Sequence, residues 1–308
     1  MYHLATVFPP VQRVGRLPLS RDQLVLLMAA VNELFIGIDV YLAHNISGEI
    51  LPNEWIPIIF GLVAGVVLLL AGVLALRNRP LATVLANLAF IGSILIGLLG
   101  VYFHLRRAGI IGGGSEGSAA INLLVFAPPF LGPLAFSLVG ALGISAAWVE
   151  DPPDSGRLRL LGRRTIQLPY SKTRAYFLIV GLFGLVTVIS STFDHARSHF
   201  ENPWVWIPLL AGIYGTVVAV TLGLIHRPTR ADLTAFAGAM VLFILVGLVG
   251  FVLHTNTNLV NTGVVVVERF IRGSPLLGPL LYANVGMLGL LALLDPREPG
   301  AQGDEPPR

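Results

Sequence analysis

Long runs of apolar residues, separated by short polar segments, dominate this chain. Eight of them are long enough to cross about 30 Å of hydrocarbon as helices. Helices are the expected form because hydrocarbon offers no hydrogen-bond partner to exposed backbone groups, and the alternating pattern of an outer-membrane barrel is absent. The pattern therefore predicts an all-α integral membrane protein with eight transmembrane helices, at residues 24–43, 55–76, 81–105, 129–149, 175–193, 204–225, 232–253 and 275–294.

The second half of the chain resembles the first half. The segment EWIP (Glu54 to Pro57) aligns with VWIP (Val205 to Pro208) at a shift of 151 residues. PFLGPLAF (129–136) aligns with PLLGPLLY (275–282) at a shift of 146. Self-similarity at a fixed period indicates a repeat architecture. An even number of crossings in each repeat makes the two repeats parallel. The sequence therefore predicts two tandem parallel four-helix repeats.

The repeats divide the chain into five parts. The two membrane repeats are joined by a basic linker and flanked by polar tails. The expected boundaries are 1–23 for the N-terminal tail, 24–149 for the first repeat, 150–174 for the linker, 175–294 for the second repeat and 295–308 for the C-terminal tail.

The distribution of charge predicts the orientation. The chain is 55% hydrophobic and 12% charged, which is outside the range of a soluble domain. Of its 20 Lys and Arg residues, the side opposite the linker has only Arg106, Arg107, Arg197, Arg269 and Arg272. The positive-inside rule then places both termini and the linker in the cytoplasm, with the protein in the inner membrane. Because topology accounts for the basic residues, the lipid bilayer is the expected partner, together with membrane partner subunits, and nucleic acid is not.

Candidate chemistry centres on histidine. The chain contains no cysteine, which excludes disulfides, thiolate metal sites, iron–sulfur clusters and covalently attached c-type haem. Four of the seven histidines form matched pairs between the repeats: His44 aligns with His195, and His104 aligns with His254. In each repeat one histidine ends the first helix and the other ends the third, so both lie at the same outer level.

The first and third helices of an up-down-up-down bundle are diagonal across its core, with axes about 12–14 Å apart. Two imidazoles bound linearly to one iron place their Cα atoms about 13 Å apart. Each repeat is therefore expected to hold haem b, or a transition metal, between its two histidines. Neighbouring loop residues are weaker candidates, because imidazole with carboxylate suits zinc, copper or non-haem iron; they are Asp39, Glu49, Asp194, His199 and Glu201.

Two alternatives to a cofactor follow from the same residues. A histidine at a helix C-terminus can bond the last carbonyls and interact favourably with the helix dipole, so all four histidines could be helix caps. Glu33 lies midway along the first predicted helix, where an ionised carboxylate costs about 2.5–3.5 kcal/mol on insertion scales. It is a candidate for proton or cation handling, or a buried neutral acid, and Gly184 stands opposite it in the second repeat.

No Walker motif, no serine–histidine–acid pattern and no other enzyme signature is evident. The expected function is therefore an electron-transfer or sensing membrane subunit that binds haem b or a transition metal through His44, His104, His195 and His254. A permease that uses Glu33 is the first alternative. A structural or assembly subunit without a cofactor is the second.

Overall fold

The computed structural model describes residues 2–10, 18–46, 48–112, 122–123, 125–126, 129–160, 164–259 and 265–296. Residues 11–17 of the expected N-terminal tail and 297–308 of the expected C-terminal tail lie outside this described part. Most described residues are helical, and six helices are long and apolar enough to cross a membrane. They are α2 (Arg21–Ile46), α3 (Trp55–Leu74), α4 (Arg79–Arg107), α7 (Lys172–Ala196), α8 (Trp206–Leu224) and α9 (Arg230–Leu259). The chain thus has the character of an all-α, multi-pass membrane protein.

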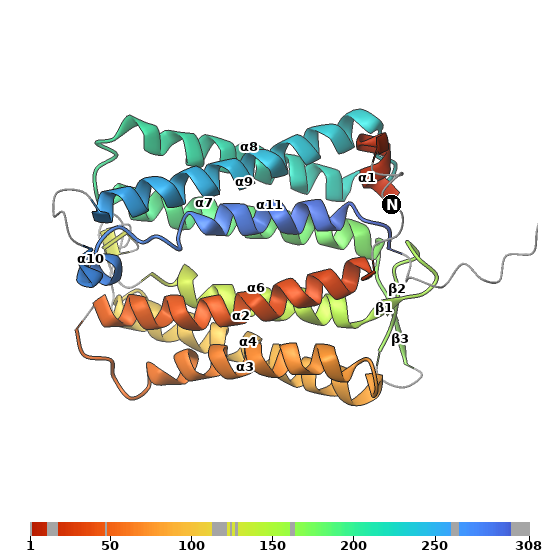
Figure 1. The fold of residues 1–308 in the computed structure, drawn as a ribbon, viewed down its shortest axis with the longest axis horizontal. Helices are drawn as coiled ribbons and strands as arrows, with labels where there is room; N and C mark the ends of the chain where they lie inside the picture. Colours follow the sequence, from red (N-terminus) through yellow and green to blue (C-terminus); the bar gives the residue numbers. More distant parts are fainter. Residues whose placement is uncertain are drawn as a thin grey trace, which may run out of the picture.

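The fourth and eighth predicted spans are shorter than expected. Helix α6 covers Leu131–Ala147, 17 residues, and α11 covers Leu280–Ala292, 13 residues. The apolar run before α11 is partly taken up by the turn around Pro275, because the two prolines of PLLGPLLY cannot donate backbone hydrogen bonds. Both helices are apolar, and each lies beside longer helices in Figure 1.

The helices form two groups of four. One group contains α2, α3, α4 and α6, and the other contains α7, α8, α9 and α11 (Figure 1). In the first group α2 and α4 each pack against α3 and α6, so α2 and α4 are diagonal. In the second group α7 and α9 are diagonal in the same way, each packing against α8 and α11. The groups meet where α6 contacts α7 and where α11 contacts α2.

Close helix contacts in the two groups involve corresponding residues. A Cβ added to Gly97 would lie 2.9 Å from the carbonyl oxygen of Pro133. A Cβ added to Gly247 would lie at the same distance, 2.9 Å, from the carbonyl oxygen of Pro279. One turn further along, an added Cβ on Gly100 would lie 2.6 Å from Pro133 Cβ, and one on Gly250 would lie 2.8 Å from Pro279 Cβ. Only glycine permits this approach of α4 to α6 and of α9 to α11.

Helix starts follow local sequence signals. Asn78 precedes α4 and its side chain accepts a hydrogen bond from Leu81 N at 3.2 Å, with Pro80 in the first turn. Ser171 precedes α7 and accepts from Arg174 N in the same way, at 3.4 Å. These side chains satisfy backbone N–H groups that have no partner inside the helix.

The linker contains a small sheet that the sequence did not predict. Strands β1 (Val149–Glu150), β2 (Arg157–Arg159) and β3 (Thr165–Gln167) form an antiparallel sheet in that order, with Leu158 paired to Glu150 and to Ile166. The strands have only two or three residues each, too few to give a periodic signal. The sheet lies at the end of the bundles where α2 and α7 begin (Figure 1).

The N-terminal helix α1 (Tyr2–Val7) docks at this same end. Leu4 N donates to the carbonyl of Leu293 at 2.9 Å, and α1 packs against α9. The His3 ring lies 6.2 Å from that of Phe177, and burial lowers the pKa of the His3 imidazole below its ordinary value. At the opposite end are the 3-10 turn η2 (Pro203–Val205) and α10 (Val267–Arg272).

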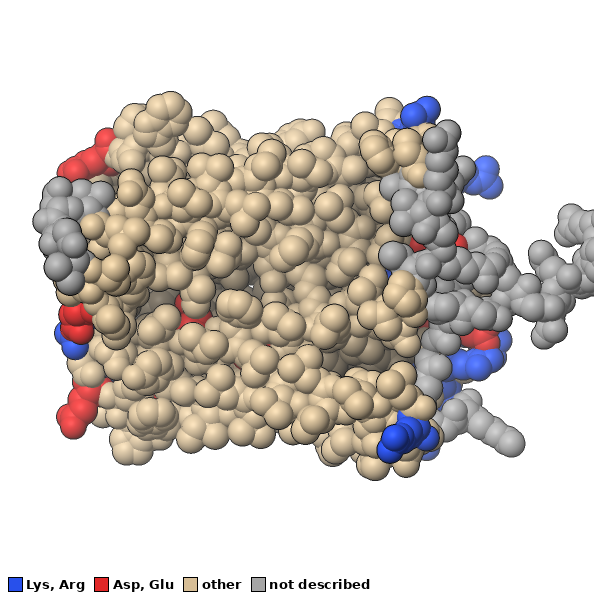
Figure 2. Space-filling view, viewed as in Figure 1, with Lys and Arg blue, Asp and Glu red and all other residues tan. Residues whose placement is uncertain are grey.

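Charged side chains gather at the two ends of the molecule (Figure 2). Lys and Arg are prominent at the end that carries the sheet, and Asp and Glu at the other end, while the long sides are almost free of charge in this view. An apolar belt of this kind, with charge at both ends, is what a bilayer requires of the protein it surrounds.

Candidate cofactor sites

The structure brings the four matched histidines together as two pairs. His44 on α2 faces His104 on α4, with ring centroids 6.1 Å apart and ring planes at 85°. His195 on α7 faces His254 on α9, with centroids 6.4 Å apart and planes at 84°. All four are partly exposed and lie near the end of the bundles opposite the sheet. The two pairs have almost the same geometry although they belong to different halves of the chain.

Backbone carbonyls orient three of these rings. Nδ1 of His104 lies 3.0 Å from Pro129 O, and Nδ1 of His254 lies 2.9 Å from Pro275 O. Nδ1 of His44 lies 2.8 Å from Val40 O. A carbonyl oxygen only accepts hydrogen bonds, so each Nδ1 must carry the proton. In the neutral ring this tautomer leaves a lone pair on Nε2, the form in which imidazole binds a metal.

These partners fit the helix-cap interpretation only at His44. His44 bonds to Val40, one turn earlier in its own helix. His104 and His254 instead bond to carbonyls of the segments that lead into α6 and α11, and α9 continues for five residues beyond His254. A ring that bonds across to another segment does not satisfy the last carbonyls of its own helix. Bonds to the last carbonyls of their own helices therefore do not account for the rings of His104 and His254, although His44, His104 and His195 lie in the last turns of their helices.

The loop candidates do not gather into a site. Asp39, Glu49, Asp194, His199 and Glu201 are all exposed. Within the described residues, no three His, Cys, Asp or Glu side chains come close enough to hold a metal ion together. Asp194 has an exposed partner in Arg197, 3.8 Å away. Asp39 lies within α2 and Asp194 within α7, close enough to interact electrostatically, while Glu49 and Glu201 lie in loops.

Glu33 is fully buried in the core of the first group of helices. Its Oε1 pairs with the Ser93 hydroxyl on α4, and that hydroxyl also lies 3.0 Å from the carbonyl oxygen of Phe136 on α6. Ser93 has one proton, so it either donates to Phe136 O and accepts from a protonated Glu33, or donates to an ionised Glu33. The second oxygen of Glu33, Oε2, has no hydrogen-bond partner within the described part of the chain.

The second group of helices has no counterpart to this carboxyl group. By the same shifts that pair the histidines, Gly184 corresponds to Glu33, Phe243 to Ser93 and Tyr282 to Phe136. The Phe243 ring lies about where the polar contact would be, because a Cβ added to Gly184 would be 3.5 Å from this ring. The Phe243 ring also packs edge-on against the Tyr282 ring, with ring centroids 5.5 Å apart. An aromatic contact thus replaces the acid–serine contact.

A buried charged cluster at the sheet end was missed by the sequence analysis. Lys172 is fully buried, and its Nζ donates to Asp22 Oδ2 and to Trp148 O, both at 2.6 Å. Tyr176 OH donates to Asp22 Oδ1 at 2.9 Å, and the Arg21 guanidinium lies 4.9 Å from the Tyr176 ring centroid. This cluster links the start of α2 to the start of α7, and so links the two groups of helices.

The cluster extends into the linker. Arg21 donates to Thr173 Oγ1 at 2.7 Å, and Thr173 donates to Asp154 Oδ1 at 2.8 Å. Glu150 of β1 accepts from the backbone N–H groups of Gly156 and Lys172 at 2.7 and 2.8 Å. A signal for this cluster was present in the sequence, because Arg21 and Lys172 align at the shift of 151 that also pairs His44 with His195.

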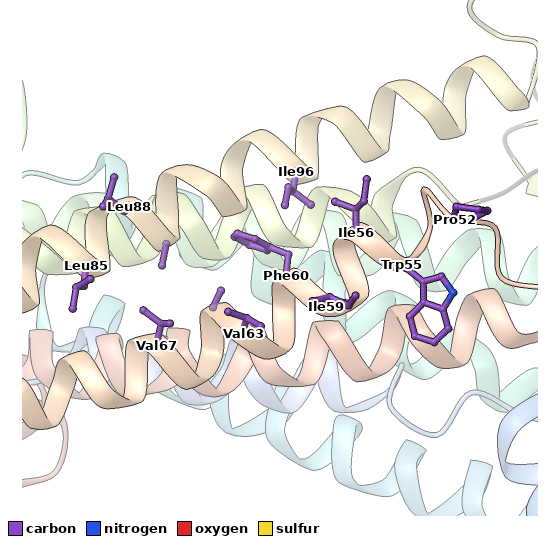
Figure 3. A pocket seen from close by; sticks show the side chains of 12 residues that line it. Pro52, Trp55, Ile56, Ile59, Phe60, Val63, Val67, Leu85, Leu88 and Ile96 are labelled. Carbon is purple, nitrogen blue, oxygen red and sulfur yellow. The ribbon is translucent and has the colours of Figure 1, made fainter.

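A groove lies between α3 and α4 on the outside of the first group (Figure 3). It has a volume of about 580 Å³, and its lining is almost entirely apolar, from Trp55 near one end through Phe60 and Val63 to Leu85 and Leu88. Several of these side chains are more than half exposed, as on a surface that faces lipid. The one polar side-chain atom of its lining residues is the indole nitrogen of Trp55 at one end, so the groove offers no set of polar groups that could orient a ligand.

Comparison of the chain with protein-family models, with curated proteins and with solved structures finds no match. Functional inference therefore rests on the two histidine pairs, the Glu33–Ser93 contact and the charged cluster.

Proposed function

We propose that all eight apolar helices cross the membrane, as two tandem parallel four-helix repeats. The matched contacts of Gly97 and Gly247 with Pro133 and Pro279 support this arrangement, as do the two histidine pairs. Helices α6 and α11 are short, but polar or irregular backbone at their ends is tolerated in a membrane where neighbouring protein covers it. The sheet end, rich in Lys and Arg, is then cytoplasmic, and the histidines lie near the outer face of the inner membrane.

Each histidine pair is proposed to hold one haem b as its two axial ligands. Imidazoles that bind one iron from opposite faces, with bonds of about 2 Å and rings about 1 Å in radius, have centroids about 6 Å apart. The observed separations are 6.1 and 6.4 Å. This agreement, found twice in one chain, is the observation that carries the proposal.

The orientation of the rings supports the same proposal. Ligating histidines usually donate their other N–H to a carbonyl or carboxylate, which fixes the tautomer and the direction of the ring. His104 and His254 do this with Pro129 and Pro275, which occupy matched positions in the two repeats. The carbonyls hold Nδ1–H and direct Nε2 away from it.

Haem is favoured over a simple metal ion because each pair supplies only two ligands. Zinc in a protein site is generally bound by three or four side chains. In the described residues no third His, Cys, Asp or Glu joins either pair. A porphyrin provides four nitrogen ligands, so two histidines complete the coordination of its iron. The group would supply one-electron chemistry, which suits an electron-transfer or sensing subunit that works with membrane partner subunits.

An absorption spectrum of the gently purified protein tests this proposal. The wild-type protein is expected to show a Soret band. His44→Ala and His104→Ala should each lower the band by roughly half, and the double variant should be no worse, because an axial pair acts as one unit while distant sites add. His195→Ala and His254→Ala should remove the other half.

His199→Ala is the matched control. His199 is an exposed histidine near His195 in the chain but has no counterpart in the first repeat, so its replacement should leave the Soret band unchanged. Protein that is colourless and free of metal would refute the cofactor. A colourless protein that contains metal, lost in His199→Ala, would favour a loop metal site with Asp194 and Glu201.

A permease is the second candidate, and the buried Glu33 is the observation that favours it. A buried acid with one unpaired oxygen in the middle of a span is the kind of group that proton-coupled transporters use. Reconstituted protein would then accumulate a solute in response to a proton gradient, and Glu33→Gln would abolish this. A protein with neither spectrum nor transport would fit the third candidate, a structural or assembly subunit.

A further inference from the structure

The Glu33–Ser93 contact lies directly beneath the first histidine pair. Glu33 precedes His44 by 11 residues on α2, and Ser93 precedes His104 by 11 residues on α4. Eleven residues make slightly more than three helical turns, so each polar residue shares a face with its histidine, about 16 Å further into the membrane. Helices α2 and α4 therefore carry the histidine pair at the outer end of the bundle and the Glu33–Ser93 pair deeper in the same core.

Ser93 can stabilise both protonation states of Glu33. Its oxygen lies within hydrogen-bond distance of Glu33 Oε1 and of Phe136 O, 3.0 Å away, but it has only one proton. When Glu33 is protonated, the carboxyl group donates to Ser93 and Ser93 donates to the carbonyl. When Glu33 is ionised, rotation of the hydroxyl group directs its proton to the carboxylate. A purely apolar environment would offer the ionised form no such donor.

The elements packed against α2 bring no second ionisable group to this depth. Helices α3 and α6 contain none, and those of α4 occur in its first turn and at its outer end, as Tyr102, His104, Arg106 and Arg107. The ionisable residue of α11 is Tyr282, which packs in the core of the other group. Helix α10, with Glu268, Arg269 and Arg272, lies at the outer end. Along α2 itself the next carboxylate is Asp39, which is exposed.

We propose that Glu33 is a proton site coupled to the redox state of the cofactor held by His44 and His104, and that the second cofactor site has no buried acid in the equivalent position. This inference rests on the proposed haem function and assigns a regulation to one of its two sites. In the second repeat Gly184 and Phe243 replace the acid and the serine, and the carboxylate that interacts with the second histidine pair is instead the exposed Asp194, near His254 at the outer end.

The coupling is electrostatic. A haem core with two neutral imidazole ligands carries one positive charge when its iron is ferric and none when it is ferrous. The positive charge favours an ionised Glu33, and its loss favours the protonated form; over about 16 Å at an effective dielectric constant of about 20, this changes the protonation equilibrium about sixfold. On reduction, one electron from a soluble one-electron reductant enters the iron, and one proton from water binds the Glu33 carboxylate. Oxidation by a soluble oxidant releases both.

Redox titrations with mediator dyes, repeated across a range of pH, test the inference. The His195→Ala variant retains only the first site, and its midpoint potential should fall with rising pH. The steepest fall expected when one proton binds with each electron is about 59 mV per pH unit, which corresponds to a tenfold change in the equilibrium constant for reduction. The reference is His44→Ala combined with Asp194→Asn. It retains only the second site and lacks the carboxylate that interacts with His254, so its slope reports the dependence that both sites share, from the haem propionates. Its slope should be smaller.

Glu33→Gln in the His195→Ala background should reduce the slope to that of the second site. Glutamine keeps the amide donor that Ser93 requires, so the fold is expected to persist. If that variant does not fold, Ser93→Ala is the substitute: it removes the donor to the carboxylate and should move the pH-dependent range upward.

The outcomes separate the inference from the function on which it rests. Haem bound at both sites with equal slopes, or a slope that survives Glu33→Gln, would refute the coupling and leave the haem proposal intact. Protein without a Soret band would refute both. A slope confined to the first site and removed by Glu33→Gln would establish the coupling.

Discussion

Lys172 offers a direct test of how the two groups of helices are held together. Its ammonium group is fully buried and contacts Asp22 Oδ2 and Trp148 O, both at 2.6 Å. Lys172→Met keeps the length of the side chain but removes the charge and both hydrogen bonds. Asp22 then loses its main counter-charge in a buried environment.

The size of the effect follows from the remaining partners. Removing one partner of a buried ion pair typically costs about 3–5 kcal/mol. Asp22 is 20% exposed and keeps the Tyr176 hydroxyl and the Arg21 guanidinium, at 2.9 and 3.4 Å. The cost should therefore fall at the lower end, about 3 kcal/mol. Asp22→Asn should cost at least as much, about 3–5 kcal/mol, because it leaves the fully buried Lys172 ammonium without its counter-charge.

Reversible unfolding in detergent micelles measures these free energies. The double variant should be less destabilised than the sum of the single variants, by about 1–2 kcal/mol, because the two residues contact each other. Arg272→Met is the control: Arg272 pairs with Glu268 on α10, but both side chains are at least half exposed, and the loss should stay below about 0.5 kcal/mol. A Lys172→Met protein as stable as the control, or additive costs in the cycle, would show that the cluster does not hold the bundles together.

Two further predictions concern topology and packing. A cysteine at Ser198 should react with an impermeant thiol reagent in intact cells while one at Ser155, in the linker, should not; the reverse labelling would invert the proposed orientation. Gly100→Leu should destabilise the protein by about 1–3 kcal/mol, since even its Cβ would lie 2.6 Å from Pro133. Gly238→Ala, where nothing lies within 4 Å, should instead stabilise α9 by about 1 kcal/mol, and equal effects in the two variants would contradict the packing argument.

The sequence by itself was sufficient to predict the membrane character of the chain. Hydrocarbon imposes long apolar helices, so six spans can be recognised by length and composition alone. The histidine pairs were also predicted from the sequence, because His44, His104, His195 and His254 align at nearly constant shifts. Aligning the second half of the chain with the first allowed residues far apart in the sequence to be paired before their distances were known.

Other features were decided by the tertiary structure. The linker sheet was missed because strands of two or three residues have no periodic pattern, and their pairing depends on the turns between them. Asp39 and Asp194 lie in α2 and α7, and Glu49 and Glu201 lie in loops; all four are exposed, and among the described residues they form no metal-binding group with the histidines. Proximity in sequence is a poor guide to proximity in space where no regular element fixes the direction of a side chain.

Glu33 and Lys172 illustrate the same division. The sequence placed Glu33 at mid-span but could not choose between an ionised and a neutral acid, because that depends on Ser93 and Phe136, which belong to other helices. Lys172 was read only as part of a basic linker, whereas the fold buries it against Asp22, 150 residues earlier. The hydrophobic pattern determines which segments enter the membrane, because each segment interacts with the same hydrocarbon regardless of its neighbours in the fold. The partners of a buried polar group are set by the packing of several segments at once, and only the folded structure specifies them.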